Sequence, residues 1–489
     1  MSELAEYVSS LSRPLVLGLG TTGVAVLEVL STLGAHPIGL DTSEEAVERA
    51  RAAAPRAQVQ LASDAADLAA RAIAAAPRLV ITSPGIAPHT PVRLALAEAG
   101  VPVISEIELA RRLQEAGSRP DTPWLAITGT NGKTTTVRLT AALLEAAGLR
   151  TVAVGNVGTP LIRVAAELGS ATGAQALALE LSSFQLQDTG RLGALGSVCL
   201  NLAPDHLDWH GSLEHYRAAK ARVYEGTRAA AIYTPDPATR AMVEEADVTE
   251  GARAIGVTLG VPGPSELGVV EDILVDRAFL DARHREARQL ATFADLSGLS
   301  GGEVPAGHLV VDVLAATALA LSAGLDPQSV APVLRSFQLD SHRGQVVAVS
   351  GGVTYVDNSK ATNPHAARAA LAGVAPGTAV WIVGGDTKGT DLTPLVAEVA
   401  GRLRGAVVIG KETTALVGAL ERNGVDCQAV PHGSPEAVSR EAAARAARMA
   451  QPGDTVLLAP AAASWDQFSS YGQRGDLFAA AVHEMGETR

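Results

Sequence analysis

Short apolar runs alternate along the chain with longer segments in which apolar residues recur every three or four positions. The run 14–17 precedes a glycine turn and a helical pattern over 24–33, and the run 125–127 precedes a second glycine turn and a helical pattern that ends near Gly148. Strands that alternate with helices in this way are typical of βαβ units, which form parallel sheets with ligands at the carboxyl ends of the strands. The pattern therefore predicts an α/β protein.

The expected strands fall into three successive regions. They are 14–17, 37–42, 78–82 and 102–105; then 125–127, 151–155, 176–180 and 199–202; then 346–349, 353–356, 379–383, 406–409 and 455–459. A turn-rich segment, 115–123, follows the first region, and the apolar helix 308–323 and the polar segment 341–344 follow the second. We therefore expect three domains: residues 1–118 and 340–489, both Rossmann-like, and a central domain, 119–339, with a mainly parallel sheet and a P-loop-type site. Residues 250–305 show weak alternation and no assignable chemistry.

Composition narrows the classes of function. A chain of 489 residues with a net charge of -13 lacks the clustered Lys and Arg that nucleic-acid binding needs. Cys199 and Cys427 are its only cysteines, so no disulfide framework or cysteine metal site is expected. The acidic start resembles no signal peptide, and no apolar run reaches the length of a membrane span. We expect a monomeric cytoplasmic protein that acts on small molecules.

The stretch 124–136 carries the clearest chemistry. An apolar strand runs into Gly129-Thr-Asn-Gly132, and Lys133 and Thr134 open a helix. Backbone N–H groups at such a helix start attract phosphates, the lysine adds a charge, and the hydroxyl can ligate Mg²⁺. Ile127 stands where the strict phosphate-loop pattern has its first glycine. The arrangement still predicts a nucleoside triphosphate site.

The first glycine turn, Gly18-Leu-Gly-Thr-Thr-Gly23, matches G-x-G-x-x-G after a strand, and Asp41 ends the next strand. That pair is the dinucleotide-binding fingerprint, which favours NAD or NADP. The glycines need only accommodate a diphosphate, however, so another diphosphate ligand, or an unliganded turn, stays open from these residues alone.

Polar residues also follow two central strands. Glu180 ends an apolar strand, where a carboxylate is costly to bury unless a partner such as a metal compensates for it. His206 follows the strand expected at 199–202, at the same edge of a parallel sheet as Lys133. Tyr216, Lys220 and Tyr224 recur at intervals of four, on one helix face. A turn-capping histidine and a solvated lysine are the alternative interpretations.

These motifs together resemble the Mur ligases, ATP-dependent enzymes that build the peptide stem of peptidoglycan in the cytoplasm. The resembling stretches are Gly129-Thr-Asn-Gly-Lys-Thr-Thr135, Glu180-Leu-Ser-Ser-Phe-Gln185, Asp205-His-Leu-Asp208, Tyr216-Arg-Ala-Ala-Lys220 and Ser359-Lys-Ala-Thr-Asn363. The glycine turn at Gly18, the turn Ser83-Pro-Gly-Ile86 and Ser464-Trp-Asp-Gln-Phe468 resemble the branch of the family that adds D-glutamate to UDP-N-acetylmuramoyl-L-alanine. The likeness spans nearly the whole chain.

The resemblance implies that ATP phosphorylates the substrate's alanyl carboxylate and that the D-glutamate amine then attacks the acyl phosphate. It implies UDP, not a nicotinamide, in the first domain. The residues implied are catalytic Lys133, Glu180, His206 and Lys220; ATP-binding Gly129, Thr130, Asn131, Gly132, Lys133, Thr134, Thr135, Arg343, Asn358 and Lys360; UDP-sugar-binding Thr21, Thr22, Asp41, Thr42, Gly85, Asn156 and His206; D-glutamate-binding Thr362, Lys388, Ser464, Trp465 and Tyr471; and, for two Mg²⁺, Thr134, Glu180, His206 and Lys220 carbamylated by CO₂.

Leu309, Asp312 and Asn358 depart from the family pattern at the adenosine end of the ATP site, and Trp465 and Tyr471 replace the commoner residue types around D-glutamate. The alternatives are another amide ligase of the superfamily, such as a folylpolyglutamate synthetase, an NAD-dependent oxidoreductase, and a non-catalytic nucleotide-binding protein. A folate enzyme would not need the first domain, and we find no Asp-Asn-Pro-Arg-type loop of a diaminopimelate- or lysine-adding relative.

Overall fold

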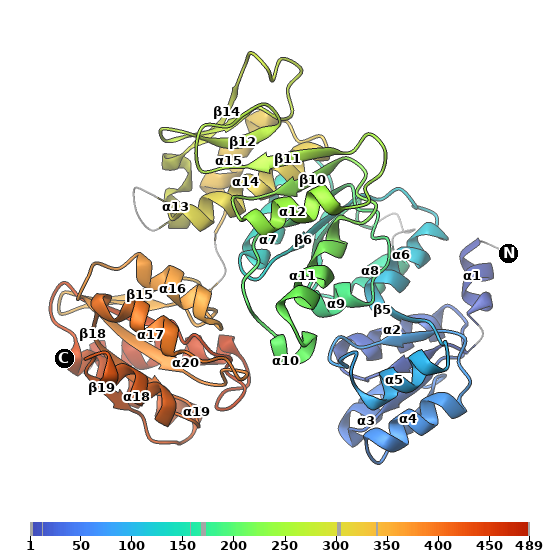
Figure 1. The fold of residues 1–489 in the computed structure, drawn as a ribbon, viewed down its shortest axis with the longest axis horizontal. Coiled ribbons are helices and arrows are strands. Elements are labelled where there is room, and N and C mark those ends of the chain that lie inside the picture. Colours follow the sequence, from blue (N-terminus) through green and yellow to red (C-terminus); the bar gives the residue numbers. More distant parts are fainter. Residues whose placement is uncertain are drawn as a thin grey trace. The chain divides into compact units, whose positions relative to one another are not determined.

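The computed structural model describes residues 3–11, 13–156, 158–167, 173–300, 305–338 and 341–487. The chain divides into two compact units, residues 1–338 and 339–489 (Figure 1). The predicted boundary at 118/119 falls inside the first unit, between its two sheets, and the one at 339/340 falls outside the described residues. Within the described ranges, no helix is long and apolar enough to cross a membrane.

The first sheet has the strand order β3-β2-β1-β4-β5 and is parallel throughout. Its strands are β1 (Leu15–Leu17), β2 (Ile38–Asp41), β3 (Gln58–Leu61), β4 (Val80–Thr82) and β5 (Val103–Ser105). Its helices are α1 (Glu3–Ser10), α2 (Thr21–Thr32), α3 (Glu44–Ala53), α4 (Ala65–Ala74), α5 (Pro91–Glu98) and α6 (Glu106–Glu115), of which α2 to α5 surround the sheet in Figure 1. Helix α2 begins at Thr21, three residues before the expected start, so the two threonines of the glycine turn occupy its first turn.

The central sheet has the order β14-β13-β12-β11-β10-β9-β6-β8-β7. Strands β7 to β12 run parallel to β6, and β13 pairs antiparallel with both β12 and β14. The strands are β6 (Trp124–Thr128), β7 (Thr151–Gly155), β8 (Ala176–Glu180), β9 (Gly196–Cys199), β10 (Ala230–Tyr233), β11 (Arg253–Val257), β12 (Glu266–Val270), β13 (Ile273–Asp276) and β14 (Arg288–Thr292). Residues 250–305, which the pattern left unassigned, therefore extend this sheet.

Helices α7 and α14 pack against each other beside the central sheet. The helices of this part are α7 (Lys133–Ala146), α8 (Leu161–Glu167), α9 (Ser183–Gln187), α10 (Leu207–His210), α11 (Leu213–Ala221), α12 (Pro237–Glu245), α13 (Ser297–Ser300), α14 (Gly307–Ser322) and α15 (Val330–Ser336). Helix α11 ends at Ala221, and Tyr224 lies in the following 3₁₀ turn. The helix face that was expected to carry Tyr216, Lys220 and Tyr224 therefore ends before Tyr224.

The strand expected at 199–202 is wrong in its bounds, because the observed strand is β9 at Gly196–Cys199. Strand β9 ends at Cys199, and two residues later Asn201 bonds to the loop of residues 129–132 that follows β6, here called the phosphate loop. In the observed register Ile127 lies beside Glu180 and Thr128 beside Cys199. The carboxyl ends of β6, β8 and β9 therefore meet at one edge, with the phosphate loop between them.

Buried polar contacts join the first sheet's helices to the central part. The Arg93 guanidinium donates to both carboxylate oxygens of Asp188 at 2.9 and 2.5 Å, with both side chains 9% exposed. Ser105 N donates to Asp188 O, and the Glu106 carboxylate accepts from Ile162 N. The Asp188 bonds anchor α5 and the end of β5 to the segment that follows β8, and the Glu106 bond anchors α6 to the start of α8.

The second unit has a six-stranded sheet of order β15-β16-β20-β17-β18-β19, parallel except for β15. The strands are β15 (Gln345–Ser350), β16 (Val353–Asp357), β17 (Ala379–Gly384), β18 (Leu403–Ile409), β19 (Cys427–Ala429) and β20 (Thr455–Leu458). The helices are α16 (Pro364–Ala372), α17 (Thr393–Val399), α18 (Thr414–Arg422), α19 (Pro435–Met449) and α20 (Tyr471–Glu487). The pattern missed β19, a three-residue edge strand without a buried residue.

Candidate active site

The loop from Gly129 to Gly132 connects β6 to α7 in a conformation that requires glycine. Gly129 has φ 149° and Gly132 has φ 86°, both in the region that side chains disfavour. A Cβ at Gly132 would lie 2.3 Å from the Asp312 carboxylate oxygen of α14. The loop can therefore present its N–H groups at the start of α7 only with these two glycines, as a phosphate cradle needs.

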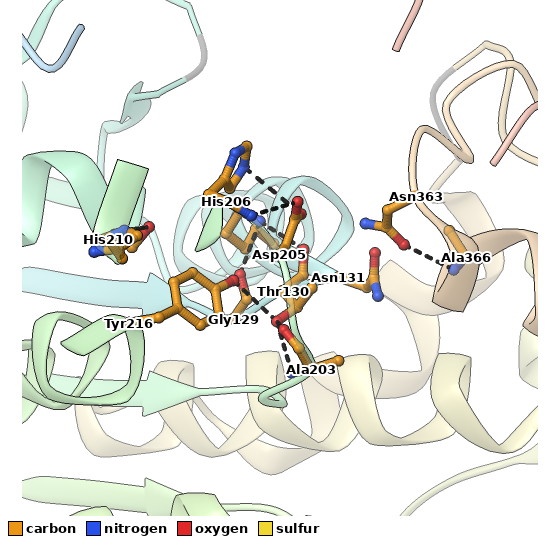
Figure 2. Close-up of polar contacts among 12 residues, drawn as sticks. Gly129, Thr130, Asn131, Ala203, Asp205, His206, His210, Tyr216, Asn363 and Ala366 are labelled. Atoms are coloured by element: carbon orange, nitrogen blue, oxygen red, sulfur yellow. Dashed lines mark hydrogen bonds and ion pairs between the residues drawn. The ribbon is translucent and has the colours of Figure 1, made fainter. Parts of the chain in front are cut away.

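The side chains of Asn201 and Tyr216 hold the phosphate loop in place, a role that the motifs did not predict. Asn201 accepts from Asn131 N at 2.8 Å and donates to Asn131 O at 3.2 Å. The Thr130 hydroxyl lies 3.1 Å from the Tyr216 hydroxyl and accepts from Ala203 N (Figure 2). A polar residue just beyond an apolar strand, as Asn201 is two residues after the end of β9, is the signal that could have identified it.

Two lysines converge on the loop. Lys133 Nζ donates to Gly129 O and Thr130 O at 2.9 Å, and Lys220 Nζ donates to the same Gly129 oxygen at 2.8 Å. Lys220 is 2% exposed. Burial, and next the Lys133 charge, lower the pKa of Lys220 to about 7. Two cations that share one carbonyl repel each other, so this arrangement favours an incoming anion or the loss of one charge.

Glu180 is buried at the end of β8, and only one of its carboxylate oxygens is paired. Oε1 accepts from Asn156 Nδ2 at 3.0 Å, while Oε2 is buried and has no hydrogen-bond partner among the residues that the structure describes. An unpaired buried carboxylate oxygen is costly unless a cation meets it. The negative charge of Glu180 raises the pKa of Lys220, so the two groups are close enough to interact electrostatically.

His206 lies seven residues beyond the end of β9, not directly after it as predicted. Its backbone has φ 53°, in the left-handed region, and its N–H donates to Asp205 Oδ1. The imidazole Nε2 is 3.6 Å from Asp205 Oδ2, and both side chains appear in Figure 2. Among the described residues, no cluster of three His, Cys, Asp or Glu side chains could hold a metal alone. A metal here would need ligands from a hydroxyl, a substrate or a modified side chain.

The residues predicted for UDP gather at the carboxyl end of the first sheet. Asp41 accepts from Leu19 N and Ser43 N, which fixes the glycine turn against the end of β2. A Cβ at Gly18 would lie 2.7 Å from Ser83 Cβ, so the glycine turn also touches the turn that contains Gly85. Thr21 and Thr22 form the first turn of α2, and Thr42 follows Asp41. Such a turn at the start of a helix is of the kind that suits an anion.

In the second unit, the predicted residues follow the carboxyl ends of β16, β17 and β20. The end of β16 is followed by Asn358, Lys360 and Thr362, and Arg343 lies before β15, whose first residue pairs with the last residue of β16. Lys388 follows β17. The segment after β20 contains Ser464, Trp465 and Tyr471. Lys388 has φ 52°, and Ser464 is 3% exposed, whereas Trp465 is 72% exposed. These residues belong to a different unit from the phosphate loop, so their approach to ATP stays a prediction.

Arg474, which sequence reasoning missed, ties two of these loops together. Its buried guanidinium donates to Ser359 Oγ and O at 2.9 Å and to Ala462 O at 3.2 Å. The 359–363 loop and the 459–467 loop are therefore held to each other through α20. A buried arginine far along the sequence gives no local signal of these partners.

Family models match three stretches of the chain: a Mur ligase MurD-like N-terminal domain at residues 12–105, a Mur ligase middle domain at 127–259 and a Mur ligase glutamate ligase domain at 342–462. The chain belongs to the Mur ligase family. Its three α/β domains with largely parallel sheets are the architecture of that family.

Relatives of known name agree with this membership. A Streptomyces avermitilis protein named UDP-N-acetylmuramoylalanine–D-glutamate ligase is 48% identical over 476 residues, which is 96% of this Mur ligase and 98% of the relative. The solved UDP-N-acetylmuramate-alanine ligase MurC of Thermotoga maritima has a TM-score of 0.55 at 18% identity and covers 98% of this chain and 100% of its own. Thermotoga maritima MurF in complex with ADP has a TM-score of 0.54 at 17% identity, over 99% and 97%. These two structures share the fold.

Proposed function

We propose that this Mur ligase joins D-glutamate to UDP-N-acetylmuramoyl-L-alanine with conversion of ATP to ADP and phosphate, a step in the synthesis of peptidoglycan precursors in the cytoplasm. The observation that carries the proposal is the buried set at the carboxyl edge of the central sheet: a glycine-dependent phosphate loop, two converging lysines and Glu180 with one unpaired oxygen. The relatives named for this reaction match nearly the full length of the chain.

The reaction needs an activated carboxylate. The terminal phosphoryl group of ATP is transferred to the alanyl carboxylate, and the D-glutamate amine displaces phosphate from the resulting acyl phosphate to form the amide. Two anions must approach each other, so positioning and cationic charge supply most of the catalysis. Lys133, with the N–H groups of the loop from Gly129 to Thr135, is suited to hold the outer phosphates, and its present bonds to loop carbonyls keep its ammonium beside them.

The donor set fits Mg²⁺ when the substrate's own oxygens are included. Glu180 offers an unpaired carboxylate oxygen, Thr134 a hydroxyl in the first turn of α7, and His206 an imidazole. Hard oxygen donors with room for phosphate oxygens are what Mg²⁺ prefers. When bound, Mg²⁺ would neutralise phosphate charge. We assign Thr134 and Glu180 to one ion and His206 to a second.

Lys220 would serve this site as a carbamate. Its amine adds to CO₂ with loss of a proton, which replaces a cation by an anion. Only the uncharged amine can react, and burial beside Lys133 lowers the pKa of Lys220 to about 7, so the uncharged amine is abundant at neutral pH. The change would also remove the repulsion between the two ammonium groups that share the Gly129 carbonyl.

The remaining substrates occupy the outer domains in this proposal. UDP would bind at the turns with Thr21, Thr22, Asp41, Thr42 and Gly85, and Asn156 and His206 would reach the sugar–peptide portion. D-glutamate would contact Thr362, Lys388, Ser464, Trp465 and Tyr471, while Arg343, Asn358 and Lys360 would meet ATP. The Arg474 bonds hold the loops after β16 and β20 to each other, which supports a fixed arrangement of the residues on them.

The test is ADP formation from ATP and Mg²⁺ with UDP-N-acetylmuramoyl-L-alanine and a panel of amino acids. We expect turnover that requires both the nucleotide sugar and D-glutamate. Turnover with L-alanine, L-lysine or diaminopimelate would keep the family and change the substrate. ATP binding without turnover for any amino acid would overturn the ligase proposal and direct attention to Leu309, Asp312 and Asn358.

A further inference from the structure

Two segments that carry proposed metal ligands are joined by a cluster of aromatic rings. One segment continues from Glu180 into α9, which contributes Phe184. The other contains His206 and α10, which contributes Trp209 and His210. The Phe184 ring lies 4.7 Å from the His206 ring, 4.7 Å from Trp209 and 5.6 Å from His210 between centroids. One side chain therefore touches three rings of the other segment.

We propose that Phe184 is a positioning residue that sets the orientation of the His206 imidazole, and that the rings of Phe184, Trp209 and His210 hold the His206 segment against the Glu180 segment. This proposal depends on the proposed function only because that function gives His206 a metal ion to bind. The contacts between the rings do not depend on it.

The local backbone at His206 is poorly suited to fix the side chain alone. His206 has a left-handed backbone, and α10 has four residues, too few for a stable isolated helix. The Phe184 and His206 rings lie at 65° to each other, a favourable edge-to-face type of aromatic geometry that limits rotation of the imidazole.

Neighbouring contacts keep Phe184 and its partners in register. His210 Nε2 lies 2.9 Å from Ser183 Oγ, the residue before Phe184, and the imidazole is 7% exposed. Trp209 N and His210 N both donate to His206 O, so α10 carries the position of the rings back to His206. His210 also packs 5.2 Å from the Tyr216 ring, which contacts the phosphate loop (Figure 2). The cluster thus joins both ligand segments to the loop.

The test compares Phe184→Leu with Phe184→Tyr, which keeps the ring, and with Phe478→Leu, a buried phenylalanine in the core of the second unit. Mn²⁺ binding is measured by electron paramagnetic resonance with UDP-N-acetylmuramoyl-L-alanine and a non-hydrolysable ATP analogue. Loss of a residue that orients a ligand weakens metal binding by roughly 10–100-fold. We expect that loss in Phe184→Leu for one class of Mn²⁺, little change in Phe184→Tyr and none in Phe478→Leu.

A second readout needs neither metal nor turnover. In the ligand-free protein the ring protons of His206, assigned by His206→Gln, should show a ring-current shift that Phe184→Leu removes. Mn²⁺ affinity within about twofold of wild type in Phe184→Leu, equal losses in Phe184→Leu and Phe478→Leu, or no ring-current shift in wild type would overturn the proposal. If the protein had no D-glutamate ligase turnover but showed the expected ring-current shift and the expected Mn²⁺ affinities, the role of Phe184 would be supported and the proposed function refuted.

Discussion

The buried ammonium of Lys220 makes the stability of the first unit depend on pH in a direction that the structure fixes. Burial, and next Lys133, lower the pKa of Lys220 from 10.5 to about 7. In the unfolded chain the group regains its ordinary pKa. Between about pH 7 and 10.5 the unfolded chain therefore binds more protons than the folded one, and stability rises with pH through this window.

The size of the effect follows from the shift. Each pKa unit corresponds to about 1.4 kcal/mol, so the full change across the window is on the order of 5 kcal/mol. Below pH 7 the folded chain carries all of this cost, because the ammonium is charged in both states. Lys220→Met removes the charge and keeps much of the volume. We expect Lys220→Met to exceed wild type in stability near pH 6.5 and the difference to shrink steadily toward pH 9.5.

The assay is differential scanning calorimetry of ligand-free protein in buffers cleared of CO₂, since carbamylation would itself remove the charge. Lys411→Met, at an exposed position of the second unit, is the control and should leave the melting profile nearly unchanged at every pH. A difference between wild type and Lys220→Met that stays constant from pH 6.5 to 9.5 would refute the assigned electrostatics.

Three further changes test other parts of the site and fold. Asn201→Ala removes two hydrogen bonds to Asn131, each worth about 1 kcal/mol, so the KM for ATP should rise by up to roughly 30-fold in initial-rate assays with unchanged affinity for the nucleotide sugar; an unaltered KM would contradict that role. Glu180→Gln keeps the shape but not the charge, and we expect kcat to fall about 100-fold or more while calorimetric binding of the nucleotide sugar persists; near-normal turnover would remove Glu180 from the metal site. Arg93→Ala leaves the Asp188 carboxylate buried and unpaired, which should cost about 3–5 kcal/mol in thermal unfolding, and a loss below about 1 kcal/mol would show that the pair contributes little.

Much of the fold was predictable because the signals are local. The apolar run before Gly129 and the glycines at positions of positive φ define the phosphate loop within a few residues. The same holds for the turn that Asp41 fixes. The backbone conformation of these elements is set by residues within them, so the chain pattern and the structure agree there.

The failures share a different cause, which is contact between distant residues. The alternation at Cys199-Leu-Asn-Leu202 predicts a strand, but Asn201 turns out to hold Asn131, and β9 ends earlier. Edge strand β3 has no buried residue, so its pattern carries no signal. Arg474 and the Phe184 ring act through partners far along the chain, which no local pattern can reveal.

The central claim is that the alanyl carboxylate becomes an acyl phosphate before D-glutamate attacks. The most direct test uses UDP-N-acetylmuramoyl-L-alanine with ¹⁸O in that carboxylate, incubated with the protein, ATP, Mg²⁺ and D-glutamate, followed by mass spectrometry of the released phosphate. The account predicts one ¹⁸O atom in the phosphate for each amide formed. Amide formation with phosphate that contains no ¹⁸O from the carboxylate would contradict it.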